Sequence, residues 1–301
     1  MGYGSWKAED YVNYARSTGR STTTTYATNA STGATTAHTV LNSSYSAQDI
    51  FSARHIDPKM DPKNVTRECN DSEEHPNTVP VILALDVTGS MGNGAAEVAK
   101  KLNVVMSQLY ENVTDVEFLV MAIGDLAYDW APIQIAQFEA DVRVAEWLDK
   151  VYFEGHGGGN NFESYTAAWY MGCRHMMLDS WKRGKKGIMI TIGDEPLNPY
   201  LPADKLAEFV GDKLQGDVET NDLYKEAIDK FDIYHLAIDD HSTSYEFYAD
   251  AIQKSWGKLL DSKHFRIVAM DEVVPQIVDI VTNATDDMVV ESFKPNMEIT
   301  W

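Results

Sequence analysis

The pattern of apolar and polar positions changes at about residue 80. Beyond it, runs of consecutive apolar residues alternate with longer segments in which apolar residues recur every three or four positions. Such runs predict buried strands, and the three-to-four spacing predicts amphipathic helices. The predicted strands cover residues 81–85, 116–124, 133–138, 187–192, 231–238 and 265–270, and the predicted helices cover residues 93–112, 141–151, 162–181, 203–214, 222–230, 244–260 and 272–282.

Strands that are apolar almost throughout, and that are followed by helices, are typical of a parallel sheet covered on both faces. The predicted fold class is therefore α/β, a doubly wound and mostly parallel sheet. In such folds, ligands bind outside the carboxyl ends of the strands. Residues that follow those ends are the first candidates for a functional site.

The N-terminal part follows a different pattern. Residues 8–15 carry a short helical pattern, whereas residues 21–46 are mostly Ser, Thr, Ala, Gly, Asn and Tyr without a helical or strand period. So little apolar area does not offset the entropy that ordering costs. We expect residues 1–46 to be a flexible arm, or an arm that becomes ordered only against a partner or another subunit.

The remaining boundaries follow from the same pattern. We expect an extended segment with three prolines that packs on the main domain, then that domain, then a tail with a strand-like stretch around residues 288–293. These three parts cover residues 47–79, 80–283 and 284–301.

Composition and charge exclude several classes of function. The 301 residues are 44% hydrophobic, which is ample for a core, but no apolar run is long enough to span a bilayer. The start of the chain lacks the basic flank and apolar stretch of a signal peptide. A formal net charge of −21 disfavours nucleic acid and anionic membranes as partners. We expect a cytoplasmic protein with two reduced thiols, Cys69 and Cys173.

Oxygen-bearing side chains follow the predicted strands at three places. Because the carboxyl ends of parallel strands meet at one rim of the sheet, we expect these side chains to lie together. Two carboxylates, two hydroxyls and an amide carbonyl are the hard oxygens that Mg²⁺ takes in an octahedron with water. The sequence predicts a site for Mg²⁺, or for Mn²⁺ or Ca²⁺, formed by Asp86, Thr88, Ser90, Asn160 or Asn161, and Asp194.

This order of motifs resembles the von Willebrand factor A family and its metal-ion-dependent adhesion site. The first motif of that family, Asp-x-Ser-x-Ser, is similar to Asp86-Val-Thr-Gly-Ser90, and its later aspartate to Asp194. The threonine of its second motif falls at Asn160, in the loop Gly-Gly-Gly-Asn-Asn-Phe-Glu. This loop is similar to that of a branch with Gly-Gly-Gly-Asp-x-x-Glu, which includes intracellular members. The resemblance covers residues 80–283.

The resemblance implies roles for the site residues. Thr88 and Ser90 would bind the metal directly, whereas Asp86 and Asp194 would act partly through water, with Asn160 in place of the usual threonine. It also implies a non-enzymatic module whose metal docks an acidic residue of a protein partner. Our first functional hypothesis is this metal-dependent protein-binding domain.

Other local roles are open for the same residues. Thr88 and Ser90 could cap the helix that follows them. Asn160 and Glu163 have the spacing of a helix-capping pair, which favours a cap over metal binding for Glu163.

Two further positions have two possible roles each, and a third stretch has one. Asp125 suits either a second layer around a metal or a turn. His156 is a rim residue or a metal ligand. Residues 175–177 lie inside the predicted helix 162–181, where they fit packing against the core.

Three other functions compete with metal-dependent binding. A phosphatase of the haloacid dehalogenase kind also has an aspartate at a strand end, but it needs a second carboxylate where this chain has Thr88. Nucleotide binding at residues 89–94 departs from the dinucleotide fingerprint. A structural protein whose N-terminal arm joins copies into a homo-oligomer is compatible with the first hypothesis, and it is our main alternative.

Overall fold

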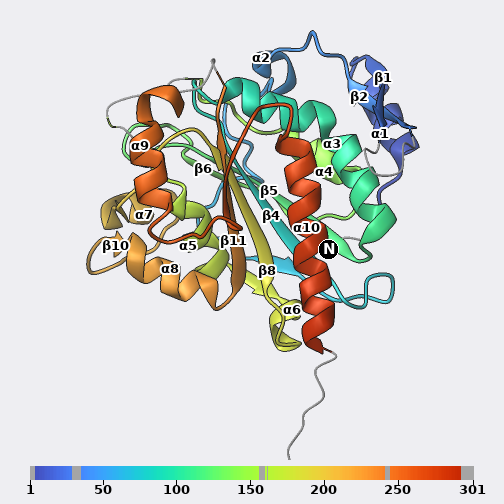
Figure 1. The fold of residues 1–301 in the computed structure, drawn as a ribbon. Coiled ribbons are helices and arrows are strands. Elements are labelled where there is room, and N and C mark those ends of the chain that lie inside the picture. The colour runs from blue at the N-terminus through green and yellow to red at the C-terminus, as the bar shows by residue number, and fades with distance from the viewer. Residues whose placement is uncertain (1–3, 29–34, 156–159, 161, 241–244, 293–301) are drawn as a thin grey trace, which may run out of the picture.

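A six-stranded sheet forms the centre of the chain in the computed structural model, which describes residues 4–28, 35–155, 160, 162–240 and 245–292 (Figure 1). Neighbouring strands are parallel except for β5 and β6, which are antiparallel. The predicted fold class is therefore confirmed. The strand order is β12 (Phe265–Val268), β11 (Phe231–Ile238), β8 (Gly187–Gly193), β4 (Val79–Asp86), β5 (Val116–Ile123) and β6 (Ile133–Ile135).

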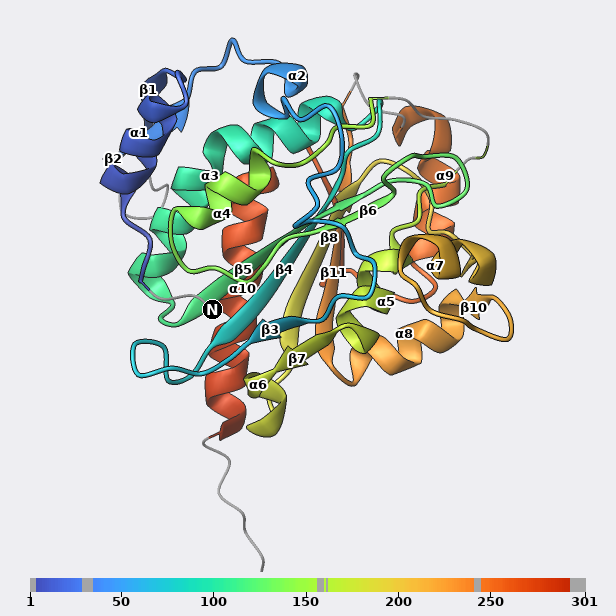
Figure 2. The same cartoon turned by 180° about the vertical axis from the view of Figure 1, so that it is seen from behind.

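Helices cover both faces of this sheet (Figures 1 and 2). Alternate residues of each strand point to opposite faces, so Leu83 and Leu85 belong to one apolar cluster while Ile82 and Ala84 belong to another. Burial on both faces explains why the strands are apolar almost throughout. One face carries α3 (Gly92–Asn112), α4 (Arg143–Leu148) and α10 (Val273–Ser292), and the other carries α5 (Thr166–Arg174), α7 (Ala203–Phe209), α8 (Thr220–Ile228) and α9 (Tyr245–Trp256).

The direction of winding changes between β4 and β8. The chain continues from β4 through α3 to β5 on one side, and from β8 through α7 and α8 to β11 on the other. Leu85 and Ile192 are neighbours in the parallel register, so the two strands end side by side. Their following loops lead to opposite faces, which is where doubly wound folds bind ligands.

The N-terminal stretch contains a hairpin that its sequence pattern does not predict. It is formed by β1 (Thr22–Thr28) and β2 (Thr35–Leu41), between α1 (Ala8–Ser17) and α2 (Ala47–Ile50). The expectation of an arm without strands is wrong for these residues, because Val40 and Leu41 find buried positions against the main domain. The chain divisions at residues 46, 79 and 283 stay a prediction.

The predicted helix 162–181 is divided in the structure. Its helical part, α5, ends at Arg174, and β7 (Met176–Leu178) then pairs with β3 (Arg67–Cys69) before α6 (Asp179–Lys182). Residues 175–177 therefore do not lie in a helix. His175 instead contacts the Val65 carbonyl oxygen and the Asp212 carboxylate, contacts that depend on residues far away in sequence.

Most other predicted elements are present with shifted ends. The strand-like stretch at residues 288–293 is a misassignment, since α10 continues to Ser292. Two short strands, β9 (Tyr200–Leu201) and β10 (Val218–Glu219), pair outside the main sheet. Cys69 and Cys173 are buried and free, as expected. Within the described residues, no helix has the length and apolar composition needed to cross a bilayer.

Candidate functional site

Asp86, the last residue of β4, is completely buried and holds hydrogen bonds at both carboxylate oxygens. Its Oδ1 accepts from the Thr88 backbone N–H at 2.9 Å and from the Thr88 hydroxyl at 2.6 Å. Its Oδ2 accepts from the Tyr165 hydroxyl at 2.6 Å. The strand end therefore fixes both the position and the orientation of this carboxylate.

A second contact joins the loops that follow β4 and β8. The Ser90 hydroxyl donates to Asp194 Oδ1 at 3.1 Å. Like Thr88, Ser90 thus gives its hydroxyl hydrogen to a carboxylate, which leaves the lone pairs of both hydroxyl oxygens available to a cation. Four of the five predicted metal ligands are brought together in this way, at the switch point of the sheet.

Neither hydroxyl caps the helix that follows. The N-cap residue of α3 is Met91, and no side-chain hydrogen bond caps that helix. The alternative in which Thr88 and Ser90 act only as helix caps is therefore wrong.

Burial raises the pKa of Asp125, and the neighbouring Asn160 side chain lowers it. The spacing of Asn160 and Glu163 suggested a capping pair as the alternative to metal binding, but α5 begins only at Thr166, whose backbone N–H donates to Asn198 Oδ1 at 3.1 Å. The capping interpretation is therefore wrong for both residues. His156 and Asn161 lie outside the described residues.

A group of buried and partly buried carboxylates surrounds Asp86. Burial and the charge of Asp194 raise the pKa of Asp86 to about 7. Burial and the charges of Asp86 and Asp194 raise the pKa of Glu195 to about 8. Burial and the charge of Asp86 raise the pKa of Glu163 to about 11. The common cause is negative charge held in a site of low polarity, which a cation would offset.

Two of the buried carboxylates also have an oxygen without a hydrogen-bond partner within the described part of the chain. These atoms are Asp125 Oδ2 and Glu163 Oε2, and both residues are at least 95% buried. Burying such an atom without a partner is costly, so it points to a missing positive or donating group. Carboxylates beside hydroxyls fit a hard divalent cation.

The acidic side chains alone do not form a metal site. Within the described ranges, no group of three or more His, Cys, Asp or Glu side chains is arranged to hold a metal ion. A cation at this rim would therefore need the hydroxyl oxygens of Thr88 and Ser90 beside the carboxylates of Asp86 and Asp194.

Tyr165 and Gly193 belong to the site although the sequence did not single them out. A Cβ atom on Gly193 would lie 2.1 Å from the Tyr165 hydroxyl oxygen, so only glycine lets that hydroxyl reach Asp86. The Tyr165 ring packs on His235 and Trp256, with centroid distances of 5.3 and 5.6 Å. Gly193 stands beside the predicted Asp194, whereas no local pattern marks Tyr165.

Comparison with known proteins gives structural similarities only. No protein-family model and no curated protein matches the chain. The structure is similar to an open form of the pilus adhesin SpaC from Lactobacillus rhamnosus GG, with a TM-score of 0.44 and 13% identity over 76% of this chain. The chain spans only 31% of that adhesin.

Two shorter solved domains are also similar. The von Willebrand factor domain of the type V pili tip protein Mfa5 from Porphyromonas gingivalis has a TM-score of 0.43 and 10% identity, covering 70% of this chain and 96% of that one. The SpRpn10 VWA domain has a TM-score of 0.38 and 11% identity, covering 70% and 95%.

Proposed function

We propose that this chain is a non-enzymatic protein-binding module that docks an acidic residue of a partner through a divalent metal ion. The observation that carries the proposal is the pair of hydrogen bonds from Thr88 to Asp86 and from Ser90 to Asp194. They bring oxygen ligands from two loops to one rim, in the orientation that leaves hydroxyl lone pairs for a cation.

The chain's own residues would have distinct roles at this rim. Thr88 and Ser90 would offer neutral oxygens to Mg²⁺, Mn²⁺ or Ca²⁺, and Asp86 and Asp194 would balance its charge, partly through water. A bound metal with mostly neutral ligands supplies an electrophilic position for an outside carboxylate. Asn160, whose side chain lies near Asp125, would lower the pKa of that carboxylate.

The environment of Asp86 supports binding over phosphatase chemistry. A nucleophilic aspartate needs a free carboxylate oxygen and a nearby acid or base. Asp86 is completely buried, and its two oxygens accept from Thr88 and Tyr165. The Thr88 hydroxyl cannot act as a general acid or base at neutral pH.

Exposed aromatic side chains extend the rim as a surface for a protein partner. Trp130 is 85% exposed and Tyr128 is 55% exposed, both in the loop after β5. Phe247, in the first turn of α9 after β11, is 86% exposed. Aromatic residues of this kind are enriched in protein interfaces.

Titration calorimetry with Mg²⁺ or Mn²⁺ tests the metal-dependent part. We expect chelator-treated protein to bind one ion and Asp86→Ala to bind none. Asp222→Ala, which removes a carboxylate from an exposed ion pair on α8, is the matched control and should bind like the native protein. Absence of binding by the native protein would contradict the proposal, as would equal binding by Asp86→Ala.

The carboxylate-docking part needs a separate probe. In Mn²⁺-loaded protein, acetate should displace a metal-bound water and reduce the relaxation enhancement of water protons. Chloride at the same ionic strength is the control. An acetate effect equal to that of chloride would leave a metal site without the proposed docking function.

A further inference from the structure

We propose that β1 pairs with β1 of a second copy of this chain, so that two hairpins join into a four-stranded antiparallel sheet. The proposal is independent of the metal-dependent function, because the residues that carry it belong to the N-terminal hairpin and its anchor. It rests on the free edge of β1, its lack of charge and the fixed base of the hairpin.

The outer edge of β2 is already occupied by the main domain. Asn103 on α3 donates its side-chain N–H to the Thr39 carbonyl oxygen at 2.7 Å. His38, Val40 and Leu41 are buried along the same strand. Of the two described hairpin strands, β1 is therefore the one that offers its outer edge to a partner.

The register between β1 and β2 determines which backbone groups of β1 point away from β2. The Asn42 N–H donates to the Ser21 carbonyl oxygen at 3.0 Å, which makes these two residues a hydrogen-bonded pair. Because such pairs alternate along an antiparallel ladder, Thr22, Thr24 and Tyr26 direct their N–H and C=O groups away from β2.

Two observations agree with this assignment. Thr39 lies opposite Thr24 in the register, and its carbonyl oxygen does point outward, to Asn103. Thr24 and Tyr26 are exposed, with Tyr26 at 73%. Among the described residues, no hydrogen bond from another element reaches the backbone of either. The edge is therefore open for a further strand.

This edge lacks the usual protection against strand pairing. Natural edge strands carry Lys, Pro, inward charges or bulges that prevent it. β1 reads Thr-Thr-Thr-Thr-Tyr-Ala-Thr, with high strand propensity and no such residue. Residues 21–48 contain no Asp, Glu, Lys or Arg, although these types make up 24% of the chain.

The lack of charge favours a second copy of this chain as the partner that pairs with β1. At a net charge of −21, two copies repel each other wherever acidic surfaces meet. The hairpin carries no Asp or Glu, so it adds nothing to that repulsion and offers no carboxylate to attract a basic partner. Antiparallel pairing across a two-fold axis also sets threonine opposite threonine, a favourable cross-strand pair.

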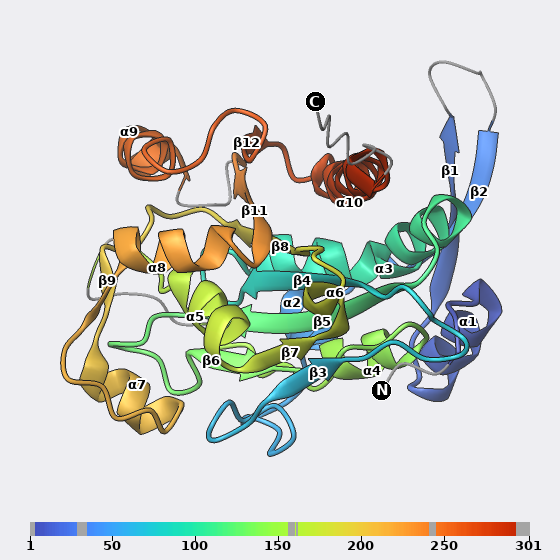
Figure 3. The ribbon, with the colours of Figure 1, turned by 90° about the horizontal axis from the view of Figure 1, so that it is seen from below.

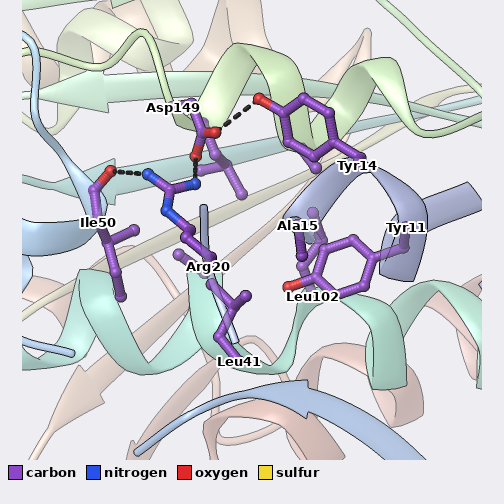
Figure 4. A pocket seen from close by; sticks show the side chains of 11 residues that line it. Tyr11, Tyr14, Ala15, Arg20, Leu41, Ile50, Leu102 and Asp149 are labelled. Atoms are coloured by element: carbon purple, nitrogen blue, oxygen red, sulfur yellow. Dashed lines mark hydrogen bonds and ion pairs between the residues drawn. The ribbon is translucent and has the colours of Figure 1, made fainter. Parts of the chain in front are cut away.

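Anchoring at the base holds the hairpin ready for pairing. The Arg20 guanidinium contacts the Asp149 carboxylate and donates to the Ile50 carbonyl oxygen at 2.7 Å, and the Tyr14 hydroxyl donates to Asp149 at 2.5 Å (Figure 4). From this base the hairpin extends past α3, away from the sheet (Figure 3). A fixed strand loses less freedom on pairing.

The expected assembly is a weak dimer, because two short strands bury less area than standard protein interfaces. The dimer would nevertheless carry two copies of the predicted metal site. A partner with two docking residues would then bind more tightly than to a single chain.

Sedimentation velocity of the full chain over a range of concentrations tests the proposal. We expect a monomer–dimer equilibrium in the native protein. Thr24→Pro removes an outward N–H that the hairpin itself does not use, and it should raise the dimer dissociation constant by about tenfold or more. Thr24→Lys, which adds a charge to the edge, should act in the same direction.

Gln48→Lys is the matched control, because it adds the same charge at an exposed position of α2. It should leave the dimer unchanged. If Thr24→Pro fails to fold, as judged by circular dichroism, Thr24→Lys decides. A native protein that stays monomeric at all concentrations would overturn the proposal. So would a dimer that persists in the folded Thr24 variants.

Discussion

Tyr165, at the start of α5, connects that helix to the predicted metal site. Its hydroxyl donates to Asp86 Oδ2 from a completely buried position, and its ring rests on His235 and Trp256. Gly193 makes room for it. The orientation of Asp86 therefore depends on α5 and β8 as well as on its own strand.

We expect Tyr165→Phe to lower the free energy of unfolding by about 1–3 kcal/mol, because it leaves a buried carboxylate oxygen without its donor. The loss should change when Mg²⁺ is added, since the ion acts on the same carboxylate. Urea denaturation with and without Mg²⁺ measures both effects. Tyr170→Phe, which removes the hydroxyl bonded to Asp212, should give a loss that Mg²⁺ does not alter. If Mg²⁺ altered neither loss, or altered both equally, Tyr165 would have no special role at the metal site.

Gly193→Ala should disturb the contact between the Tyr165 hydroxyl and Asp86. The added methyl group would meet the Tyr165 hydroxyl oxygen at 2.1 Å, and relieving that overlap costs about 1–3 kcal/mol of stability. Gly216→Ala is the control, because no atom lies within 4 Å of its added Cβ. Thermal denaturation of both variants checks this. A Gly193→Ala protein as stable as Gly216→Ala would show that Tyr165 does not need this space.

At the scale of elements, a partly buried ion pair holds the base of the N-terminal hairpin on the main domain. The Arg20 and Asp149 side chains are 11% and 18% exposed, and Asp149 also accepts from Tyr14. Arg20 lies two positions before the first residue of β1. Its loss should therefore release the base of the hairpin.

We expect Arg20→Met to lower the free energy of unfolding by about 1–3 kcal/mol, because the Ile50 carbonyl oxygen and Asp149 Oδ1 lose the guanidinium that donates to them. Arg174→Met, at the more exposed pair with Glu226, should cost at most about 1 kcal/mol. Urea denaturation measures the difference, and limited proteolysis should show earlier cleavage near β1 in Arg20→Met. Equal losses in the two variants would contradict this role of the anchor.

The central sheet could be predicted from sequence because burial on both faces makes its strands apolar throughout. The break of the predicted helix at His175 could not, because the apolar residues of β7 also fit a helical pattern. Its strand partner, β3, lies more than a hundred positions earlier. The hairpin was missed for a similar reason, since Val40 and Leu41 are buried by α3 rather than by their neighbours in sequence.

The same limit applies to the site. Asp86, Thr88, Ser90 and Asp194 could be placed on one rim because strand ends position them. The assignment of Asn160 to the same site stays a prediction, and its side chain lies near Asp125. Loop residues such as Glu163 take positions that depend on packing from several elements, which local spacing does not encode.

At the scale of the whole molecule, the rim carboxylates add to an already acidic chain. Burial and repulsion raise the pKa of Glu195 from 4.5 to about 8 and that of Asp86 from 3.8 to about 7. In the metal-free protein these groups keep their protons to higher pH in the folded state than in the unfolded state. Between these values the unfolded chain binds fewer protons, so the free energy of unfolding decreases as the pH rises.

We therefore expect the melting temperature in EDTA to decrease between the unfolded pKa of Glu195, 4.5, and its folded pKa of about 8, and Mg²⁺ to reduce that decrease. Glu195→Gln should make the dependence on pH weaker. Glu208→Gln, at an exposed position of α7, is the control. Melting curves over this pH range measure the slope. An unchanged slope in Glu195→Gln would contradict the assignment.

The central claim is that a divalent cation binds at the switch point between β4 and β8. Anomalous diffraction from crystals of the full chain grown with Mn²⁺ tests it most directly. The account predicts one strong peak in contact with the hydroxyl oxygens of Thr88 and Ser90 and next to Asp86 and Asp194. No peak there at saturating Mn²⁺, or a peak only at another surface, would contradict it.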